Sequence, residues 1–95
     1  MAKLESRYLY VIRCGDRLKI GIAVDCKKRL KTLQTGNADK LILEWSRERD
    51  DAAQVEAHLH RKFSKHRVGG EWFDGTQITV DEIIVASYNY IEYNW

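Results

Sequence analysis

The sequence has no proline, no low-complexity run and no uninterrupted apolar stretch long enough to span a membrane. Hydrophobic residues make up 44% and charged residues 32% of its 95 residues, which is typical of a compact folded domain and excludes a disordered tail. The segment Met1–Arg7 has no apolar stretch behind its charges, so no secretory signal is expected. We therefore expect one domain over residues 1–95, located in the cytoplasm.

The two cysteines, Cys14 and Cys26, do not have the spacing of a metal-binding motif, and we expect two separate thiols. The net charge of +2 is too small to indicate nucleic-acid binding by itself. Its distribution is uneven, because basic residues cluster at Arg13, Arg17, Lys19, Lys27, Lys28, Arg29 and Lys31 and again at Arg61, Lys62, Lys65 and Arg67. Such runs are common on solvated faces, so an ordinary surface and an anion-binding surface remain equal alternatives on composition alone.

The first half of the chain predicts a β-hairpin, a helix and a third strand. Residues 8–12 are aromatic or aliphatic, and residues 18–22 alternate apolar with polar or small residues. Between them, residues 14–16 contain the glycine and aspartate of a tight turn. Asp25 can cap the helix that carries the basic run, and residues 41–45 then have the pattern of a strand.

The second half predicts two more helices with a loop between them. Residues 50–51 can cap a helix whose apolar residues recur every four positions, at Val55, Leu59 and Phe63. Gly69–Gly70 marks the expected end of this helix, and residues 71–75 are expected to form a turn or loop.

The C-terminal segment predicts the last helix. Thr79 and Glu82 match a capping box at the start of an aromatic-rich helix over about residues 80–94. This helix either packs on its own sheet or forms the interface of a homodimer or partner complex, because exposed aromatics often mark interfaces. With the order β-β-α-β-α-α, the expected fold class is α+β, a small three-stranded antiparallel sheet flanked by helices.

Five sequence blocks resemble the GIY-YIG nuclease superfamily. They are, in order, Tyr8-Leu9-Tyr10 with Lys19-Ile20-Gly21, residues 29–33, Thr35-Gly36-Asn37, Glu56–His60 and Gly70–Phe73. They cover about residues 8–75 and look like the short phage-type and meiotically up-regulated-gene-like branch, in which lysine replaces the tyrosine of the second motif. The resemblance implies metal-dependent hydrolysis of nucleic-acid phosphodiesters, with DNA as substrate and Mg²⁺ or Mn²⁺ as cofactor.

The resemblance also assigns catalytic roles to Tyr10, Lys19, Arg29 and Glu56. Tyr10 and Lys19 take the places of the two motif tyrosines, Arg29 that of the helix arginine, and Glu56 that of the metal-binding glutamate. Their chemistry is coherent, because Mg²⁺ commonly binds one or two carboxylates plus phosphate, and a guanidinium group matches a phosphate. Tyrosine is a poor base at a pKa of about 10, so Lys19 either stabilises the Tyr10 phenolate or accepts the proton itself.

Each of these residues also has a purely structural interpretation. Tyr10 can be a packing residue, Arg29 can cover a helix face with its aliphatic stem, and Glu56 can pair with His60 one turn later. His58 and His60 are two apart on a helix and point to different faces, which argues against a zinc pair. Nucleic-acid contacts are expected from Lys27, Lys28, Arg29, His60, Lys62 and Arg67.

Two departures from the family pattern keep other functions open. Tyr8 stands where the first motif has glycine, and Lys19 stands where the second has tyrosine. The main alternative is a nucleic-acid-binding or partner-binding module on the same fold that has lost turnover. A third hypothesis is a structural subunit that docks through its aromatic C-terminus. Glu71 is expected to be either a second acid near the site or a group that satisfies loop amides.

Overall fold

The fold begins with an antiparallel hairpin. In the computed structural model, which describes residues 7–90, β1 (Arg7–Cys14) pairs with β2 (Arg17–Ala23) around a turn in which Gly15 has a φ of 59°. That conformation favours glycine, because a Cβ atom is strained there. The remaining elements are α1 (Cys26–Thr35), β3 (Ile42–Arg49), α2 (Ala52–Lys62), the short 3-10 helix η1 (Ser64–His66), β4 (Arg67–Gly69), β5 (Trp72–Asp74) and α3 (Val80–Asn89).

The sheet has five strands, in the order β3-β1-β2-β5-β4, with every pairing antiparallel. The α+β class is confirmed, but the predicted three-stranded sheet is wrong. The two additional strands, β4 and β5, are three residues each and form a hairpin across Gly70, whose φ is 53°. They lie in segments predicted as the end of a helix and as a loop. Three residues are too few for an alternating pattern to be recognised in the sequence.

The second helix also ends earlier than predicted. It stops at Lys62, and Phe63 is its C-terminal cap, so the glycine pair lies in the β-hairpin beyond it. The apolar stripe of the sequence ends at the same place, because Phe63 is the last of its residues to be buried against the sheet. The prediction for the last helix covered residues 80–94. The structure describes α3 over Val80–Asn89, and the segment after residue 90 lies outside the described residues.

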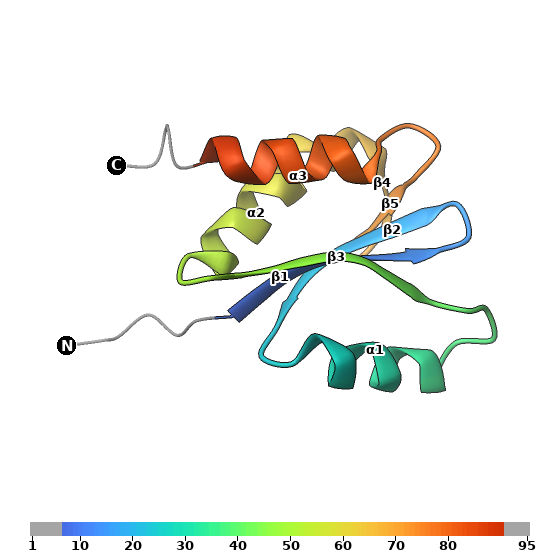
Figure 1. The fold of residues 1–95 in the computed structure, drawn as a ribbon. Helices are drawn as coiled ribbons and strands as arrows, with labels where there is room; N and C mark the ends of the chain where they lie inside the picture. The colour runs from blue at the N-terminus through green and yellow to red at the C-terminus, as the bar shows by residue number, and fades with distance from the viewer. Residues whose placement is uncertain (1–6, 91–95) are drawn as a thin grey trace.

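The two faces of the sheet are covered by different helices (Figure 1). Leu9 and Val11 of β1 belong to the larger core, which packs under α2 and α3. Tyr10 and Ile12, the alternate residues of the same strand, belong to a smaller core on the side of α1. The two-residue period of the hairpin therefore divides the chain into a two-helix layer, the sheet and a one-helix layer.

The helix starts follow the sequence signals in two cases out of three. The Asp25 side chain accepts a hydrogen bond from the Lys28 amide at the start of α1, and Thr79 and Glu82 form the predicted capping box of α3. At the start of α2, Asp51 caps no amide with its side chain. Cys14 and Cys26 are free thiols, as predicted. Within residues 7–90, none of the helices combines the length and the apolar character that crossing a membrane requires.

Asp51 instead anchors a buried arginine. Its carboxylate accepts two hydrogen bonds from Arg49, at 2.7 and 3.1 Å, and the same guanidinium donates to the carbonyl of Ser87 in α3. The Arg49 side chain is 7% exposed, so its charge depends on this partner. Hydrogen bonding to Arg49 holds the pKa of Asp51 below its usual range. This cluster ties β3, the start of α2 and the end of α3 together.

We expect Asp51→Asn to lower the free energy of unfolding by about 1–2 kcal/mol at pH 7, because the hydrogen bonds lose their charge. The pKa of Asp51 is depressed in the folded state, so its contribution exists above the unfolded pKa of about 3.9 and is lost as pH falls through the folded value. Urea denaturation at pH 7 and in acid checks this. Asp50→Asn, a change at the exposed neighbouring residue, is the matched control.

Gly21 allows the Tyr10 ring to lie across β2. The two residues are directly paired, and a Cβ atom at Gly21 would lie 2.5 Å from the Tyr10 hydroxyl oxygen. No real Cβ atom packs that closely, so a larger residue must displace the ring or the strand. This glycine therefore fixes where the hydroxyl of Tyr10 is placed.

Gly21→Ala is expected to destabilise the protein by about 1–3 kcal/mol, through overpacking in a filled core. Gly69→Ala serves as control, since a Cβ atom there meets nothing within 4 Å. Urea denaturation of both variants measures the difference. Equal stability of the two variants would show that the Tyr10 ring does not occupy this place.

Candidate functional site

The site forms where β2 runs past the end of β5. Their pairing covers Arg17–Lys19 of β2, and one further backbone hydrogen bond joins the Ile20 amide to the carbonyl of Glu71 at 3.1 Å. The strand β2 continues to Ala23, so its edge beyond Lys19 is left to be approached by another element. Side chains from both faces of the sheet can meet at such an edge.

Helix α2 approaches this edge. His60 donates a hydrogen bond from Nε2 to the Ile20 carbonyl, 2.8 Å away, and its ring contacts Phe73 edge-on at 5.2 Å. The carbonyl can only accept, so Nε2 carries a proton, and in the neutral ring Nδ1 keeps its lone pair. This bond fixes the rotation of α2 and presents Glu56, one turn earlier, to the same place.

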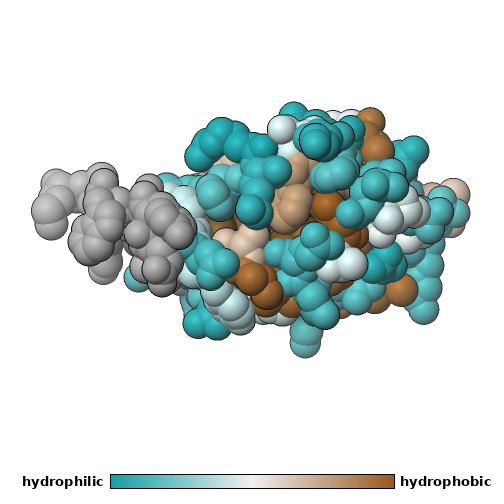
Figure 2. All heavy atoms as spheres, turned by 90° about the horizontal axis from the view of Figure 1, so that it is seen from above, coloured by the Kyte–Doolittle hydropathy of each residue, from teal (hydrophilic) through white to brown (hydrophobic). Residues whose placement is uncertain are grey.

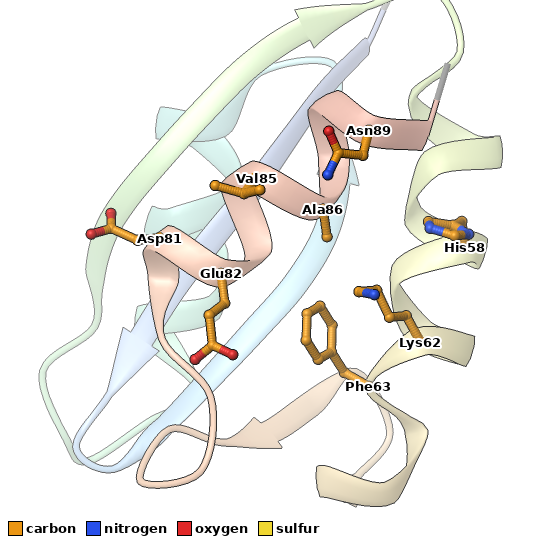
Figure 3. A pocket seen from close by; sticks show the side chains of 8 residues that line it. All are labelled: His58, Lys62, Phe63, Asp81, Glu82, Val85, Ala86 and Asn89. Carbon is orange, nitrogen blue, oxygen red and sulfur yellow. The ribbon is translucent and has the colours of Figure 1, made fainter. Parts of the chain in front are cut away.

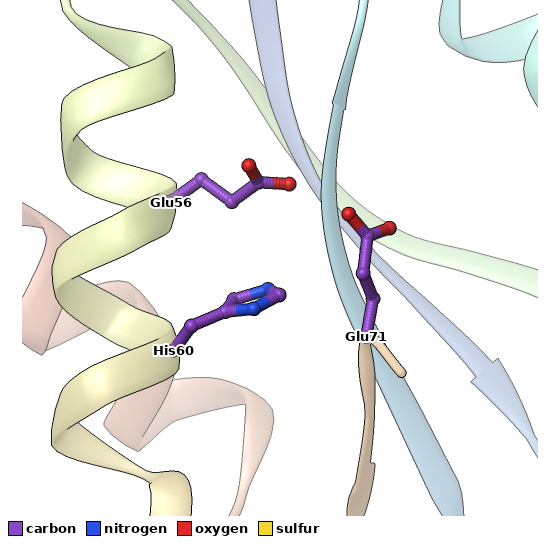
Figure 4. A group of neighbouring side chains, drawn as sticks. All are labelled: Glu56, His60 and Glu71. Atoms are coloured by element: carbon purple, nitrogen blue, oxygen red, sulfur yellow. The ribbon is translucent and has the colours of Figure 1, made fainter. Parts of the chain in front are cut away.

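Three potential metal ligands converge here: Glu56, His60 and Glu71 (Figure 4). One ligand atom from each lies within 4.8 Å of the others. Glu56 and His60 project from α2, and Glu71 faces them from the segment that enters β5. Two carboxylates and an imidazole are a donor set suited to a divalent cation.

One oxygen of the Glu56 carboxylate is buried where no hydrogen-bond donor reaches it. Its Oε2 has no hydrogen-bond partner. Burial, and then the negative charge of Glu71, raise its pKa to about 7, while Lys19 acts in the opposite direction. A carboxyl group held beside a second carboxylate in this way takes up either a proton or a cation. The residues present therefore fit a bound metal ion.

Lys19 lies beside the two acids. Its ammonium group forms an ion pair with Glu71 at 3.0 Å and lies 5.4 Å from the centre of the Trp72 ring. The Lys19 side chain is 11% exposed, whereas that of Glu71 is 39% exposed. The lysine is thus fixed between an aromatic ring and an acid that is itself half-open to solvent.

Tyr10 is fully buried, and its hydroxyl group has no hydrogen-bond partner. Burial raises the pKa of this phenol, the nearby Arg29 guanidinium lowers it, and Glu71 and Glu56 raise it further. Arg29 itself is exposed on α1 and lines a shallow surface hollow beside Ile22. Arg29 is therefore a surface residue whose guanidinium group is near enough to the buried phenol to act on its pKa.

The structure brings together the four residues predicted to be catalytic. Tyr10, Lys19 and Arg29 come from the side of α1, and Glu56 comes from α2. Of the predicted nucleic-acid contacts, His60 lies at the site, but its Nε2 is hydrogen-bonded to the Ile20 carbonyl.

The other predicted nucleic-acid contacts do not form one surface. Lys27 and Lys28 are exposed on α1, on one side of the sheet. Lys62 lies on the opposite side, in the groove between α2 and α3. Arg67 lies over the Phe73 ring, 5.8 Å from its centre. A single ligand face can use the lysines of α1 together with Arg29, but not Lys62.

Glu71 is the residue that sequence reasoning left undecided. It stands between Gly70, which turns the chain, and Trp72 and Phe73, which pack on the sheet. An acid fixed between a glycine turn and two aromatic anchors has a defined position, and this is the signal that could have identified it. Its meeting with Glu56 depends on the placement of α2, which no local pattern contains.

A groove of about 600 Å³ separates α2 from α3 on the far side of the two-helix layer. Phe63, Val85 and Ala86 supply its apolar wall, and Lys62 reaches from α2 toward Ala86 of α3 (Figure 3). Seen from above this layer, apolar atoms reach the surface between polar ones (Figure 2). This groove is separate from the cluster of Glu56, His60 and Glu71.

The fold and the site define a small α+β domain with an acid, histidine, lysine and tyrosine cluster at an open strand edge. The chain belongs to the T5orf172 domain family, whose model matches residues 7–86. This domain is found in phage-type and nuclease-like proteins. Comparison with the curated proteins and with the solved structures found no match.

Glu56→Gln is expected to stabilise the metal-free protein in mild alkali. The folded-state pKa of Glu56 is raised to about 7, so the folded protein holds its proton more tightly than the unfolded chain. Its ionisation therefore costs stability as pH rises from the unfolded pKa of about 4.3 through the folded value. Thermal melts in EDTA should give the variant the higher Tm at pH 8, with the advantage shrinking towards pH 5. A variant less stable than wild type at pH 8 would contradict this.

Proposed function

We propose that this domain is a metal-dependent endonuclease that hydrolyses DNA phosphodiester bonds. One observation carries the proposal: the Glu56 carboxylate, whose Oε2 is buried without a hydrogen-bond partner, lies together with Tyr10, Lys19 and Arg29 at one open strand edge. The resemblance of the sequence blocks to the GIY-YIG superfamily supports the same reaction. So does membership of a family found in nuclease-like proteins.

Glu56 would hold a Mg²⁺ or Mn²⁺ ion. A divalent ion supplies Lewis-acid stabilisation of the phosphate oxygens in such a reaction. Binding it would also neutralise the carboxylate whose Oε2 has no donor. One or two protein carboxylates, with waters and phosphate, commonly suffice for Mg²⁺.

Arg29 would bind the phosphate of the substrate. The residue is exposed on α1, and a guanidinium group has a planar set of donors that matches a phosphate group. Lys27 and Lys28 lie on the same helix and would extend this contact along the DNA backbone.

Tyr10 and Lys19 would handle the proton of the attacking water. Burial raises the pKa of Tyr10, so the metal-free protein holds a neutral phenol that can donate a hydrogen bond. Positive charge placed at the neighbouring carboxylates would oppose this effect and favour the phenolate, which is the form that accepts a proton. The Arg29 guanidinium, which lowers the pKa of Tyr10, would favour that anion, and Lys19 would stabilise it further or take the proton in its place.

A nucleic-acid-binding module without turnover is the second candidate. The full burial of the Tyr10 hydroxyl and the upward shift of its pKa favour this alternative, since both disfavour a base at neutral pH. Such a module would bind phosphates through Arg29 and the lysines of α1 and would need no metal at Glu56. Metal dependence therefore separates the two functions.

The deciding experiment is a cleavage assay on supercoiled plasmid, branched DNA and single-stranded DNA, with Mg²⁺, with Mn²⁺ and with EDTA. Cutting should require the metal, and Glu56→Gln and Tyr10→Phe should each reduce the rate by about 10²-fold or more. Asp81→Asn and Tyr88→Phe, which alter exposed residues of α3, are the matched controls and should retain full activity.

Two outcomes would count against the nuclease. Cutting that persists in EDTA would remove the role of the metal. Salt-sensitive DNA binding without cutting on any substrate, in either metal, would establish the binding module instead.

A further inference from the structure

We infer that Glu71 is a second carboxylate ligand of the metal ion, and that it leaves Lys19 in order to bind. The inference rests on the proposed function and deepens it, since it adds a ligand to the site of Glu56. It makes the loading of the metal and the release of the Lys19 ammonium group one coupled event.

Glu71 already lies within reach of an ion bound at Glu56. Glu71, Glu56 and His60 each offer a ligand atom within 4.8 Å of the others, and an ion between them could be reached by side-chain rotation alone. The Glu71 backbone is held in place, because its carbonyl accepts from the Ile20 amide. A ligand on a fixed backbone costs little ordering when it binds.

Two buried polar atoms at the site have no hydrogen-bond partner. Glu56 Oε2 and the Tyr10 hydroxyl are both buried and have no hydrogen-bond partner. Tyr10 is fully buried and lies near enough to both carboxylates to be influenced by each. Buried polar groups are ordinarily paired, so two such atoms beside the same pair of acids fit a site that binds a ligand there.

Exposure decides which partner moves. The Lys19 side chain is held against Trp72 and is 11% exposed, whereas the Glu71 side chain is 39% exposed. An ion pair open to solvent on one side contributes little to stability, so it can be exchanged readily. Glu71 can therefore turn from Lys19 to a cation while Lys19 stays where it is.

The charges also balance in this arrangement. With both carboxyl groups ionised, two carboxylates and one ammonium group give the metal-free cluster an excess of one negative charge. A divalent ion makes the cluster positive by one, which a phosphodiester would neutralise. Lys19, freed from Glu71, would then be available to the phosphate.

Europium(III) luminescence tests this on the full chain. Lifetimes in H₂O and D₂O count the water molecules bound to the ion, and competition with Mn²⁺ gives its affinity. Glu71→Asp keeps the charge but shortens the side chain, so it separates a ligand from a nearby charge. Lys19→Met removes the competitor for Glu71, and Asp81→Asn is the control for loss of a remote acid.

We expect Glu71→Asp to add bound water to the ion and to weaken Mn²⁺ binding by about tenfold or more. Lys19→Met should tighten Mn²⁺ binding, and Asp81→Asn should change neither quantity. Circular dichroism confirms that each variant is folded before it is scored.

The outcomes separate this inference from the proposed function. Wild-type binding that Glu56→Gln abolishes and Glu71→Asp leaves unchanged, in affinity and in water count, overturns the role of Glu71 and leaves the nuclease proposal standing. Failure of the wild-type chain to bind Mn²⁺ or europium removes both. Weaker binding in Lys19→Met overturns the exchange between Lys19 and the metal.

Discussion

The hydrogen bond from His60 to the carbonyl of Ile20 is the contact on which the site depends. It joins α2 to the one stretch of β2 that β5 does not cover. Because the sheet ends there on one side, α2 can place a carboxylate beside side chains that belong to the sheet face covered by α1. In a sheet paired along its whole edge, Glu56 and Tyr10 would be separated by backbone.

Much of the fold could be predicted from the sequence, because its signals are local. The alternation of the hairpin, the cap at Asp25 and the capping box at Thr79 each depend on residues a few positions apart, and the structure contains all three. The strands β4 and β5 could not be predicted, since three residues beside a glycine pair have too little periodicity. Their pairing with β2 is a tertiary event.

The site, too, could be predicted from the sequence only in part. The sequence blocks single out Tyr10, Lys19, Arg29 and Glu56, and the structure brings these four together. The position of Glu71 opposite Glu56 follows from where the β5 pairing stops and how α2 is rotated, which are long-range facts. The clustering of basic residues in the sequence was a poorer guide, because neighbouring positions on α2 point to different faces and Lys62 turns towards α3.

The unequal division of the core affects how the protein opens. Helix α1 rests on a cluster of four buried residues, whereas α2 and α3 share a cluster of twelve. Local unfolding follows the weaker packing, so α1 should detach as a separate cooperative unit before the sheet and the other helices separate. Arg29 travels with that unit. A phosphate group bound both by Arg29 and by the rest of the site would then hold α1 against the sheet, so that a bound ligand would stabilise the layer that opens first.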